Sequence, residues 1–444
     1  MSQWQQRLSR GAYSSLLRLL QPAYALRLWL RGRREPLYRH ALGERFGRYA
    51  KAAGDGVDPG WLWVHAVSLG ETRAAQALIE ALRARQPGLR LLLTHGTATG
   101  REAGHSLLRA GDAQAWLPYD SPGAVRRFLR HFRPRLGVMM ETEIWPNLLM
   151  AASRAGVPMV LANARLSEKS RKQGQRLNVI LRPAVQSFAL VLAQTEADAR
   201  RLRERGARAV EVVGNLKFDM TPEAALVALG RRWRGQLTRP VLLAAVTREG
   251  EEAQLLDAWC ALDAAHAERR PLLLLVPRHP QRFDEVAALV VARGLTLARR
   301  SSWQETPPIE ALGLDVWLGD SMGEMALYYG LSQVALLGGS FAPLGGQNLI
   351  EAAACACPVV MGQHTFNFAE AAQLSIQAGA AFRVADMTAG LARALQLLSH
   401  AGSHADSQAA AAEAAVKFAS QHRGAAQRMA ERLLDVMNAD ALAA

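Results

Sequence analysis

Cysteine is scarce in this 444-residue chain, which contains only Cys260, Cys355 and Cys357. Their number is odd, no two form a C-x-x-C pair, and all three lie in apolar surroundings. Disulfides and a thiolate zinc site are therefore not indicated, and we expect buried, reduced thiols in a reducing compartment. His279 likewise has no second histidine or carboxylate at metal-ligand spacing. No metal and no other cofactor is predicted.

The chain also lacks an uninterrupted apolar run. No apolar core is followed by a small-residue cleavage site, so a cleavable secretory signal is not predicted. Residues 12–30 are apolar and aromatic, but Arg18, Pro22 and Arg27 interrupt them, which argues against a bilayer-spanning helix. A helix lying in the membrane interface fits better, because arginines there reach lipid phosphates. The alternative is an N-terminal helix packed on its own domain or on a partner.

Acidic residues are in the minority. The 39 aspartates and glutamates face 53 lysines and arginines, which gives a net charge of +14. Such an excess attracts nucleic acid, anionic lipid or a phosphorylated substrate. It can equally reflect a basic proteome in which arginine covers solvated faces, such as residues 200–205. Nucleic acid is not a predicted partner, because neither a helix-turn-helix nor an exposed aromatic platform is present.

Strands and helices alternate from Trp61 onward, which predicts an α/β fold. The expected strands are continuous apolar runs, typical of parallel sheets covered on both faces. They lie at 61–67, 89–94, 135–140, 157–161, 190–193, 210–213, 240–246, 271–276, 315–318, 334–337 and 358–361. Helices are expected between them, for example at 71–85 and 124–131. We therefore predict two doubly wound, Rossmann-like domains facing across a cleft, with ligands at the carboxyl ends of the strands.

Domain boundaries follow from this alternation and from the length, which is too great for one core. We expect a membrane-associated helix at 1–34, a first domain at 35–214, a linker at 215–222 and a second domain at 223–444. The final helical segment, 407–444, is assigned to the second domain. A crossing back to the first domain is its alternative.

A glycine-rich stretch in the second half is a candidate ligand site. The strand expected at 334–337 leads through Gly338, Gly339 and Ser340, and then a second glycine pair, into a helix at 348–354. A strand that leads through glycines to a helix start brings backbone N–H groups toward an anion, commonly a phosphate. Asn348 and Glu351 lie on one helical face, where they suit ribose hydroxyls. They fit an N-cap and its capping-box partner equally well.

Glu71 is a candidate general base in the first half. It lies at a strand-to-helix transition, HAVSLGE, where a carboxylate faces the expected cleft and can accept a proton from an attacking hydroxyl. We expect the helix N-terminus to depress its pKa and keep it ionised. A first-turn glutamate that only complements the helix dipole is the alternative.

Other charged groups follow strand ends in the same way. Glu141 and Glu143 can balance positive charge developing at a sugar carbon, or can orient a neighbouring arginine such as Arg165. Lys217 and the adjacent pair Arg278 and His279 are cations suited to phosphate or carboxylate. Surface ion pairs are the alternative for these cations.

Together these motifs resemble one known family, the 3-deoxy-D-manno-octulosonic acid (Kdo) transferases of lipopolysaccharide synthesis. The resemblance covers residues from about 32 to about 370. It rests on RGRREPLYRHALGERFG, HAVSLGE, METEIWPNL, NARLSEKS, QTEADA, GNLKFD, VPRHPQRF, GDSMGEM, GGS, GGQNLIEAA and HTFNF.

The resemblance implies a GT-B glycosyltransferase at the cytoplasmic face of the inner membrane. Such an enzyme transfers Kdo from CMP-Kdo to a lipid A precursor, contacts membrane lipids and uses no metal. The family's motifs place the general base at Glu71 and transition-state stabilisers at Glu141 and Lys217. They place the cytidine nucleotide on the second domain, at Arg278, His279, Met322, Gly323, Glu324, Asn348, Leu349, Ile350 and Glu351.

The sequence departs from the family at two places. Residues 94–100 read THGTATG where a threonine-rich segment is usual, and the first helix carries extra arginine, which favours peripheral attachment. Two alternatives to Kdo transfer stand beside it. One is a GT-B enzyme with a different nucleotide sugar, and the other is a non-catalytic basic membrane-binding relative. The second predicts loss of the acidic site residues, yet Glu71, Glu141 and Glu351 are all present.

Overall fold

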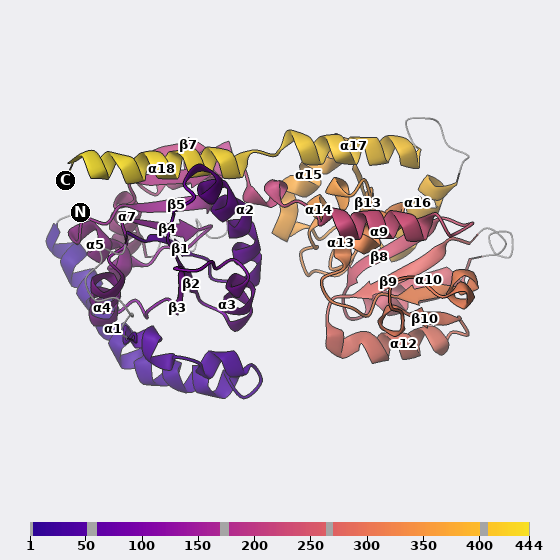
Figure 1. The fold of residues 1–444 in the computed structure, drawn as a ribbon, viewed down its shortest axis with the longest axis horizontal. Helices are drawn as coiled ribbons and strands as arrows, with labels where there is room; N and C mark the ends of the chain where they lie inside the picture. Colours follow the sequence, from indigo (N-terminus) through magenta and orange to yellow (C-terminus); the bar gives the residue numbers. More distant parts are fainter. Residues whose placement is uncertain (1–2, 51–59, 169–176, 263–269, 400–406, 444) are drawn as a thin grey trace. The chain divides into compact units, whose positions relative to one another are not determined.

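The computed structural model describes residues 3–50, 60–168, 177–262, 270–399 and 407–443. The motif at 163–170 and the expected helix at 1–34 each include two residues outside these ranges. The chain forms two compact units (Figure 1). The first comprises residues 1–220 and 422–444, and the second comprises 221–421.

The first unit is built on a seven-stranded, all-parallel sheet of order β3-β2-β1-β4-β5-β6-β7. Its strands are β1 Leu62–His65, β2 Leu91–His95, β3 Ala113–Trp116, β4 Leu136–Met140, β5 Met159–Ala164, β6 Leu190–Ala193 and β7 Val210–Val212. Its helices are α1 Gln3–Arg31, α2 Leu69–Arg85, α3 Ala98–His105, α4 Pro122–Phe132, α5 Pro146–Arg154, α7 Asn178–Gln186, α8 Glu196–Glu204 and α18 Ala425–Ala443. Short 3₁₀ turns are η1 Pro36–Arg39, η2 Leu42–Phe46 and η4 Leu216–Asp219.

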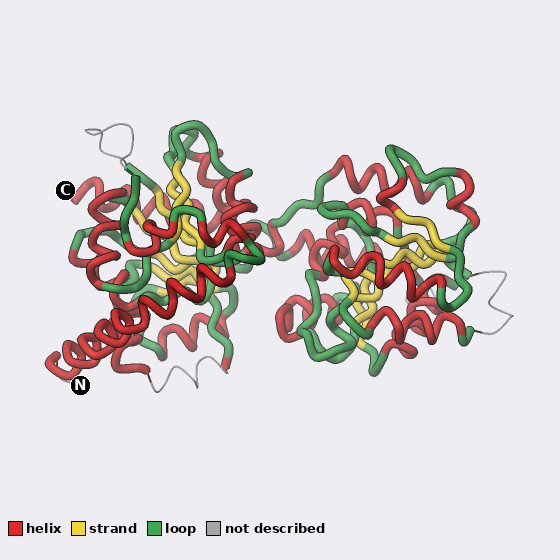
Figure 2. The backbone as a smooth tube through the Cα atoms, turned by 90° about the horizontal axis from the view of Figure 1, so that it is seen from below, coloured by secondary structure: helices red, strands yellow, loops and turns green. Residues whose placement is uncertain are grey.

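Both faces of this sheet are buried, which explains why its strands are continuous apolar runs. Successive residues point to opposite faces. On β1, Leu62 and Val64 therefore join a core with α2 and α18, whereas Trp63 joins a second core with α4, α5, α7 and α8. Figure 2 shows the strands enclosed by helices.

Helix α1 is fastened to the first unit along one side. Tyr13 Oη donates a hydrogen bond to Asp120 at 3.0 Å, and Ser14 Oγ donates to Asn147 Oδ1 at 3.1 Å. Tyr24 packs against Tyr119, and Leu28 is buried. No helix in the described part of the chain is long and apolar enough to cross a bilayer.

The second unit repeats the plan, with a parallel sheet of order β10-β11-β9-β8-β12-β13-β14. Its strands are β8 Val241–Thr247, β9 Leu272–Pro277, β10 Leu297–Arg299, β11 Val316–Leu318, β12 Val334–Leu337, β13 Val359–Met361 and β14 Ala381–Arg383. Its helices are α9 Ala224–Arg234, α10 Glu251–Cys260, α12 Phe283–Val291, α13 Met325–Leu331, α14 Leu349–Ala354, α15 Ala369–Gln377, α16 Met387–Leu398 and α17 Gln408–Gln421. Its 3₁₀ turns are η5 Pro280–Arg282, η6 Arg300–Ser302, η7 Ile309–Gly313 and η8 Phe366–Phe368.

Glycines let α9 and α13 pack closely in this unit. A Cβ atom at Gly230 would lie 2.1 Å from the carbonyl oxygen of Leu327, and one at Gly330 would lie 2.6 Å from that of Val227. Side chains larger than hydrogen would force the two helices apart.

The structure divides the chain differently from the expected boundaries. Leu216 and Phe218, in the expected linker 215–222, are buried in the first unit, so the chain leaves that unit only after Met220. The expected second domain, 223–444, includes α18, which the structure places with the first unit. The physical reason is that α18 buries apolar residues such as Met429 and Leu433 in the first unit's core.

The structure adds three strands that the sequence analysis missed, and it corrects the expected burial of one cysteine. The edge strands β3, β10 and β14 were not predicted, because they are short and partly exposed and so lack a continuous apolar run. Cys355 and Cys357 are buried as expected, but Cys260 ends α10 and is exposed. The adjacent Trp259 packs into the core, whereas Cys260 faces the solvent, so apolar neighbours in the sequence did not indicate burial of the thiol.

Candidate active site

The order of the strands marks one place in the first unit for a ligand. Strands β2 and β3 extend the sheet on one side of β1, whereas β4 to β7 extend it on the other. Chain connections therefore diverge between β1 and β4, and ligands of doubly wound sheets bind at the carboxyl ends of such neighbouring strands. Glu71 follows β1 and Glu141 follows β4, so the fold brings both carboxylates to this place.

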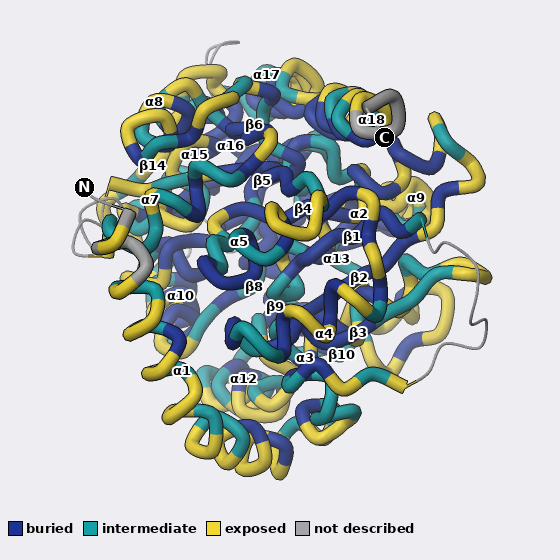
Figure 3. Tube along the Cα trace, turned by 90° about the vertical axis from the view of Figure 1, so that its left-hand side faces the viewer, coloured by how far each residue is buried: buried dark blue, intermediate teal, exposed yellow. Residues whose placement is uncertain are grey.

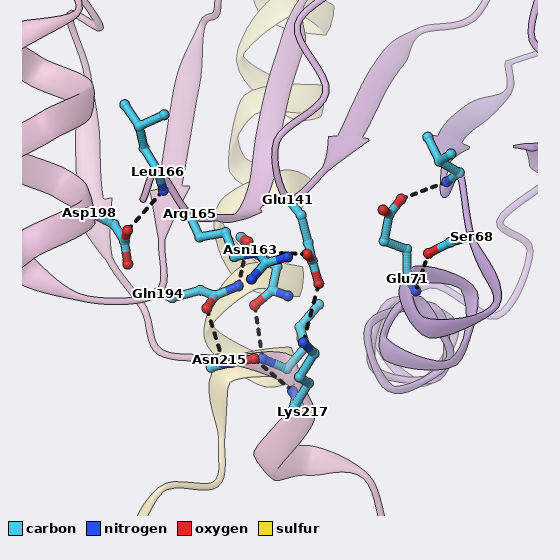
Figure 4. Close-up of polar contacts among 12 residues, drawn as sticks. Ser68, Glu71, Glu141, Asn163, Arg165, Leu166, Gln194, Asp198, Asn215 and Lys217 are labelled. Atoms are coloured by element: carbon cyan, nitrogen blue, oxygen red, sulfur yellow. Dashed lines mark hydrogen bonds and ion pairs between the residues drawn. The ribbon is translucent and has the colours of Figure 1, made fainter. Parts of the chain in front are cut away.

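Glu71 is held in position by the start of α2. Ser68 is the N-cap, and its hydroxyl accepts a hydrogen bond from the Glu71 N–H at 3.3 Å. The Glu71 carboxylate in turn accepts one from the Val67 N–H at 2.6 Å. This reciprocal pair is close to a capping box, so the residue has a structural contribution as well as a reactive group. Figure 4 shows the carboxylate on the side of Glu71 that faces Glu141.

The pKa of Glu71 corrects the sequence-based expectation. Burial is the main cause that raises this pKa to about 7; the hydrogen bond from the Val67 N–H opposes it, and the negative charges of Glu141 and Glu143 add to it. The helix N-terminus therefore does not dominate, because desolvation of the carboxylate outweighs it. A carboxyl group that titrates near neutrality can accept a proton at physiological pH.

Glu141 is buried and has an unusual backbone conformation. It is 5% exposed, and its φ of 56° lies in the left-handed region that side chains larger than glycine's rarely adopt. Asn163, at the end of β5, has a φ of 52°, and the pairing register of β5 with β6 shifts there. Such strain costs on the order of 1–3 kcal/mol per residue and clusters at functional sites. The positive φ values turn the side chains of Glu141 and Asn163 away from the alternation of a regular strand.

A polar network joins these residues to the turn η4. Arg165 Nε donates to Glu141 Oε2 at 2.9 Å, and Lys217 Nζ lies 3.8 Å from Glu141 Oε1. The Glu141 carboxylate thus lies between two cations. Its hydrogen bond with Arg165 is the contact that the sequence analysis gave as the alternative to a direct catalytic contribution. The rest of the network comprises Asn163, which accepts from the Leu216 N–H, Gln194, which donates to the Asn163 carbonyl, and Asn215, which donates to Gln194 (Figure 4).

Glu143 lies beside the same carboxylates. It accepts a hydrogen bond from Trp145 Nε1 at 2.8 Å, and burial raises its pKa, with a further contribution from the charge of Glu141. Three carboxyl groups therefore share this corner of the first unit. Elsewhere in the described residues no group of three or more histidine, cysteine or acidic side chains is arranged to hold a metal ion, and this corner is not such a group either.

In the second unit the strand connections diverge between β8 and β12. The nucleotide-binding residues expected from the resemblance follow β9, β11 and β12, so the parallel sheet brings them to one edge. Arg278 follows β9, where its N–H donates to the Thr247 carbonyl at 3.0 Å. His279 is exposed, and partial desolvation lowers its pKa, as do the charges of Arg248, Arg278 and Arg282.

The loop after β11 contains three of the residues expected to bind the nucleotide, and they differ in exposure and contacts. Met322 is 64% exposed, and Gly323 has a φ of 84°, which suits glycine. Glu324 stands at the start of α13, where it accepts hydrogen bonds from Arg300 Nη2 at 2.7 Å and from Ser321 Oγ. This carboxylate is therefore held in place before any ligand binds.

The glycine-rich loop after β12 differs from the expectation. Its backbone N–H groups at Gly339, Phe341 and Ala342 donate to the carboxylate of Glu251, at 2.8, 3.2 and 3.2 Å. Glu251 begins α10 and is 1% exposed. A carboxylate of the protein thus occupies the N–H groups that we expected to meet a phosphate.

The final predicted stretch, 348–351, forms the start of α14. Asn348 is its N-cap and accepts from the Ile350 N–H at 3.1 Å, as the capping alternative states. Leu349 and Ile350 are each 1% exposed, so their side chains belong to the core and only their backbone can reach a ligand. Glu351 is partly exposed on the first turn.

Sequence reasoning did not select Asn163, Gln194 and Asn215. Each is a neutral side chain, and each lies inside a motif noted only for its similarity. Their positions in the sequence could have identified two of them, because Asn163 and Gln194 come just after the expected strands 157–161 and 190–193, as Glu141 comes after 135–140. Their contacts, however, join residues up to 53 positions apart in the chain.

Comparisons with known proteins agree on one family. Residues 40–220 match the family described as 3-deoxy-D-manno-octulosonic-acid transferase (kdotransferase). A 3-deoxy-D-manno-octulosonic acid transferase from Bordetella pertussis is 49% identical over 439 residues, which are 96% of this chain and 99% of the relative. One from Haemophilus influenzae is 34% identical over 430 residues, 96% of this chain and 98% of the relative.

Two solved structures share the fold. A glycosyltransferase from Rickettsia africae has a TM-score of 0.56 at 14% identity and covers 85% of this chain and 98% of its own. HepE from Anabaena, solved in complex with UDP, has a TM-score of 0.55 at 14% identity and covers 84% of this chain and 99% of its own. This likeness concerns the fold alone, and it confirms the predicted GT-B class with two Rossmann-like domains.

Proposed function

Because this chain belongs to the Kdo transferase family of glycosyltransferases, we propose that it transfers Kdo from CMP-Kdo to a lipid A precursor with inversion. The names of the relatives state the transferred sugar. The donor, the acceptor and the stereochemistry are our proposal, supported by the motif resemblance and by the chemistry of the site. The observation that carries the mechanism is the carboxyl group of Glu71, with a pKa of about 7 beside Glu141.

Glu71 is the proposed general base. Its carboxylate takes the proton of a glucosamine hydroxyl on the acceptor, and the hydroxyl oxygen forms a bond to the anomeric carbon of Kdo. The bond from that carbon to the phosphate oxygen of CMP breaks, and CMP leaves with the electron pair. Attack on the face opposite the leaving group inverts the configuration. General bases of this kind contribute on the order of 10²–10⁴-fold in rate.

Glu141 and Lys217 are the proposed stabilisers of the transition state. Positive charge develops at the anomeric carbon as CMP departs, and the buried Glu141 carboxylate favours it electrostatically. Lys217 Nζ and Arg165 Nε hold the Glu141 carboxylate in a fixed position, at 3.8 and 2.9 Å. A fixed carboxylate needs no reorganisation during the reaction, which is the source of its catalytic effect.

The second unit is the proposed donor-binding part. CMP-Kdo carries one phosphate and the carboxylate of the sugar, so two anions need cations. Arg278 and Arg248 supply the positive charge. Desolvation and the neighbouring arginines lower the pKa of His279, so this residue contributes a hydrogen bond and not a charge. Glu324 and Glu351 are acceptors suited to ribose hydroxyls, together with Asn348. The segments 322–323 and 349–350 then contribute backbone contacts and shape.

Helix α1 is the proposed membrane contact at the cytoplasmic face of the inner membrane. Opposite its buried side, α1 exposes a row of large apolar side chains, and Figure 3 shows exposed positions recurring along it. They are Trp4, Leu8, Leu16, Leu19, Leu20, Leu26, Trp29 and Leu30. An apolar helix face bordered by arginines favours an anionic bilayer surface. A lipid acceptor would then be reached without leaving the membrane.

Transfer is tested by incubating the purified protein with CMP-Kdo, generated in situ, and a tetra-acylated lipid A precursor. We expect a product that mass spectrometry shows heavier by one or more Kdo residues. No product, with an active control enzyme present, would contradict the proposal. Calorimetric titration with CMP and with UDP then tests the identity of the donor separately from the transfer reaction. Binding of UDP but not of CMP would indicate a different nucleotide sugar.

A further inference from the structure

The loop between β2 and α3 contacts the residue that holds Glu71. Val67 donates its N–H to the Glu71 carboxylate at 2.6 Å. The carbonyl oxygen of Val67 accepts three hydrogen bonds from the loop. They come from the Gly96 N–H at 3.2 Å, the Thr97 N–H at 3.0 Å and the Thr97 hydroxyl at 2.9 Å. The backbone of Val67 therefore connects loop 96–97 to the proposed general base.

The Thr97 hydroxyl has a fixed direction. Thr97 is the N-cap of α3, and its Oγ1 accepts a hydrogen bond from the Gly100 N–H at 3.2 Å. A hydroxyl has one proton to donate, and here that proton goes to the Val67 carbonyl. Because the start of α3 occupies a lone pair of this oxygen, the helix holds the hydroxyl in place against Val67.

Glycines let the loop come this close to Val67. A Cβ atom at Gly96 would lie 2.8 Å from Cγ1 of Val67, and one at Gly100 would lie 2.9 Å from the Val67 carbonyl oxygen. Both distances are shorter than real contacts of a Cβ atom. A side chain at either position would therefore displace Val67 or the loop.

The loop itself is fixed on its other side by Arg45. Arg45 Nη2 donates to the Gly96 carbonyl at 3.0 Å, so the peptide group between Gly96 and Thr97 is held at both its carbonyl and its N–H. Arg45 is 3% exposed, and its guanidinium carbon lies 4.0 Å from the centre of the Trp116 ring. A buried side chain packed on an aromatic ring has little freedom to move. The loop is thus a rigid support for Val67.

We propose that Thr97 is a positioning residue for the general base. Its hydroxyl fixes the carbonyl of Val67, and the backbone of Val67 directs its N–H at Oε2 of Glu71. Oε1 of Glu71 accepts no hydrogen bond from the described part of the chain, which leaves it to take the proton of the acceptor hydroxyl. The inference rests on the proposed function of Glu71, and it gives the segment 94–100 a contribution to catalysis.

Charged groups from several elements act on Glu71. Glu141 and Glu143, after β4, raise its pKa, and Lys217 in η4 lies 3.8 Å from the Glu141 carboxylate. His95, on β2, precedes the loop, but burial lowers its pKa to about 4, so it is neutral near pH 7. The substitutions proposed below change none of these groups. A change in the pKa of Glu71 would therefore report on its hydrogen bond to the backbone.

Thr97→Val tests the proposal, because it keeps the shape of the side chain and removes the hydroxyl. The two backbone donors to Val67 remain, so the effect is partial. We expect kcat for Kdo transfer to fall about five- to tenfold, the value of one hydrogen bond, with KM unchanged. The Val67 N–H lowers the pKa of Glu71, so a weaker bond should move the acid limb of the pH profile to higher pH. Thr97→Ser restores the hydroxyl and should restore both values.

Ser106→Ala is the matched control on the same helix. It removes a hydroxyl at the far end of α3 that donates to the Ala103 carbonyl at 2.9 Å. We expect the wild-type kcat and pH profile. A loss of folded enzyme alone would lower the rate equally at every pH and leave the acid limb in place. The proposal is overturned by that result for Thr97→Val, or by a Thr97→Ser variant as impaired as Thr97→Val.

Gly100→Ala provides a second variant in case Thr97→Val does not fold. Its Cβ atom pushes against the Val67 carbonyl, whereas alanine favours a helix more than glycine does. We expect the same fall in kcat and the same upward shift of the acid limb. Wild-type kinetics in this variant would contradict the proposal.

A measurement without substrate separates this inference from the proposed function. Carbon-13 NMR of glutamate labelled at the carboxyl carbon gives the pKa of Glu71, with its signal assigned by its absence in Glu71→Gln. We expect a higher pKa in Thr97→Val and the wild-type value in Thr97→Ser. If wild type transfers no Kdo and this shift is present, the proposed function fails and the positioning by Thr97 stands. If wild type transfers Kdo and the shift is absent, the positioning is overturned.

Discussion

At the scale of single residues, Glu71 decides whether the proposed chemistry is correct. Glu71→Gln keeps the size of the side chain and an oxygen that can accept from Val67, but it cannot take a proton. We expect correct folding and a loss of transfer of about 10²–10⁴-fold, measured as kcat by mass spectrometry. The matched control is Glu80→Gln, an exposed position on the same helix. Appreciable turnover by Glu71→Gln would remove Glu71 from the role of base.

The pH dependence of transfer follows from the same group. Because burial and neighbouring carboxylates raise the pKa of Glu71 to about 7, half of the enzyme holds a protonated base at that pH. We expect kcat/KM to fall about tenfold per pH unit below pH 7. An acid limb near the ordinary value of 4.5 would show that the site does not raise this pKa.

Stability should depend on pH through Glu71 as well. Its pKa is about 7 in the folded protein against 4.5 for an ordinary glutamate, so the folded state binds this proton more tightly. The resulting stabilisation is complete below pH 4.5 and is lost as the pH rises through 7. Glu71→Gln stays neutral and should avoid the loss. Urea unfolding should therefore show its advantage over wild type growing between pH 5 and 8, by roughly 1–3 kcal/mol.

Residue identity explains only part of this site. Glu71, Glu141 and Lys217 were predicted from their places after strands and from the family motifs, and the structure brings Glu141 and Lys217 together. The direction of the Glu71 pKa was predicted wrongly, because the sequence shows the helix start but not the burial. Asn163, Gln194 and Asn215 were missed, since their contacts form only when distant strand ends meet.

At the scale of elements, the start of α18 is held by a residue far away in the chain. Asp219, in η4, accepts hydrogen bonds from the Gly424 and Ala426 N–H groups at 2.5 and 2.6 Å. It caps a helix whose own first turn has no acidic residue. The motif GNLKFD thus contributes both Lys217 to the site and the cap of α18.

Asp219→Ala tests the importance of this cap. We expect the free energy of unfolding of the first unit to fall by about 1–2 kcal/mol, because two backbone donors lose their acceptor. Urea unfolding followed by circular dichroism measures it. Asp435→Ala, which removes an exposed surface pair with Arg432 on the same helix, is the control. If both substitutions lowered the free energy of unfolding equally, the cap at Asp219 would contribute no more to stability than an exposed surface ion pair.

At the scale of the whole molecule, the proposal assigns different tasks to the two units. Glu71 and its network belong to the first unit, and the proposed donor residues belong to the second. Binding of the nucleotide and turnover should therefore be separable by single substitutions.

Arg278→Ala and Glu71→Gln form the informative pair. We expect Arg278→Ala to weaken CMP binding by about tenfold or more, because a charge-assisted contact to phosphate is lost. Glu71→Gln should bind CMP as wild type does and yet fail to transfer Kdo. Calorimetric titration measures both affinities. Arg293→Ala, which breaks a pair with Asp257 in the second unit, is the control. Unchanged CMP binding by Arg278→Ala would exclude Arg278 from the donor site.

The sequence by itself determined the α/β class, most strands, the family and the charged residues at the strand ends. Local hydrophobic periodicity and short motifs carry that information, because each depends on residues near one another in the chain. Tertiary structure alone decided the rest. Burial raised the pKa of Glu71, Glu251 took the N–H groups of the glycine-rich loop, and α18 returned to the first core. Each of these depends on desolvation or packing between distant segments, which no local pattern contains.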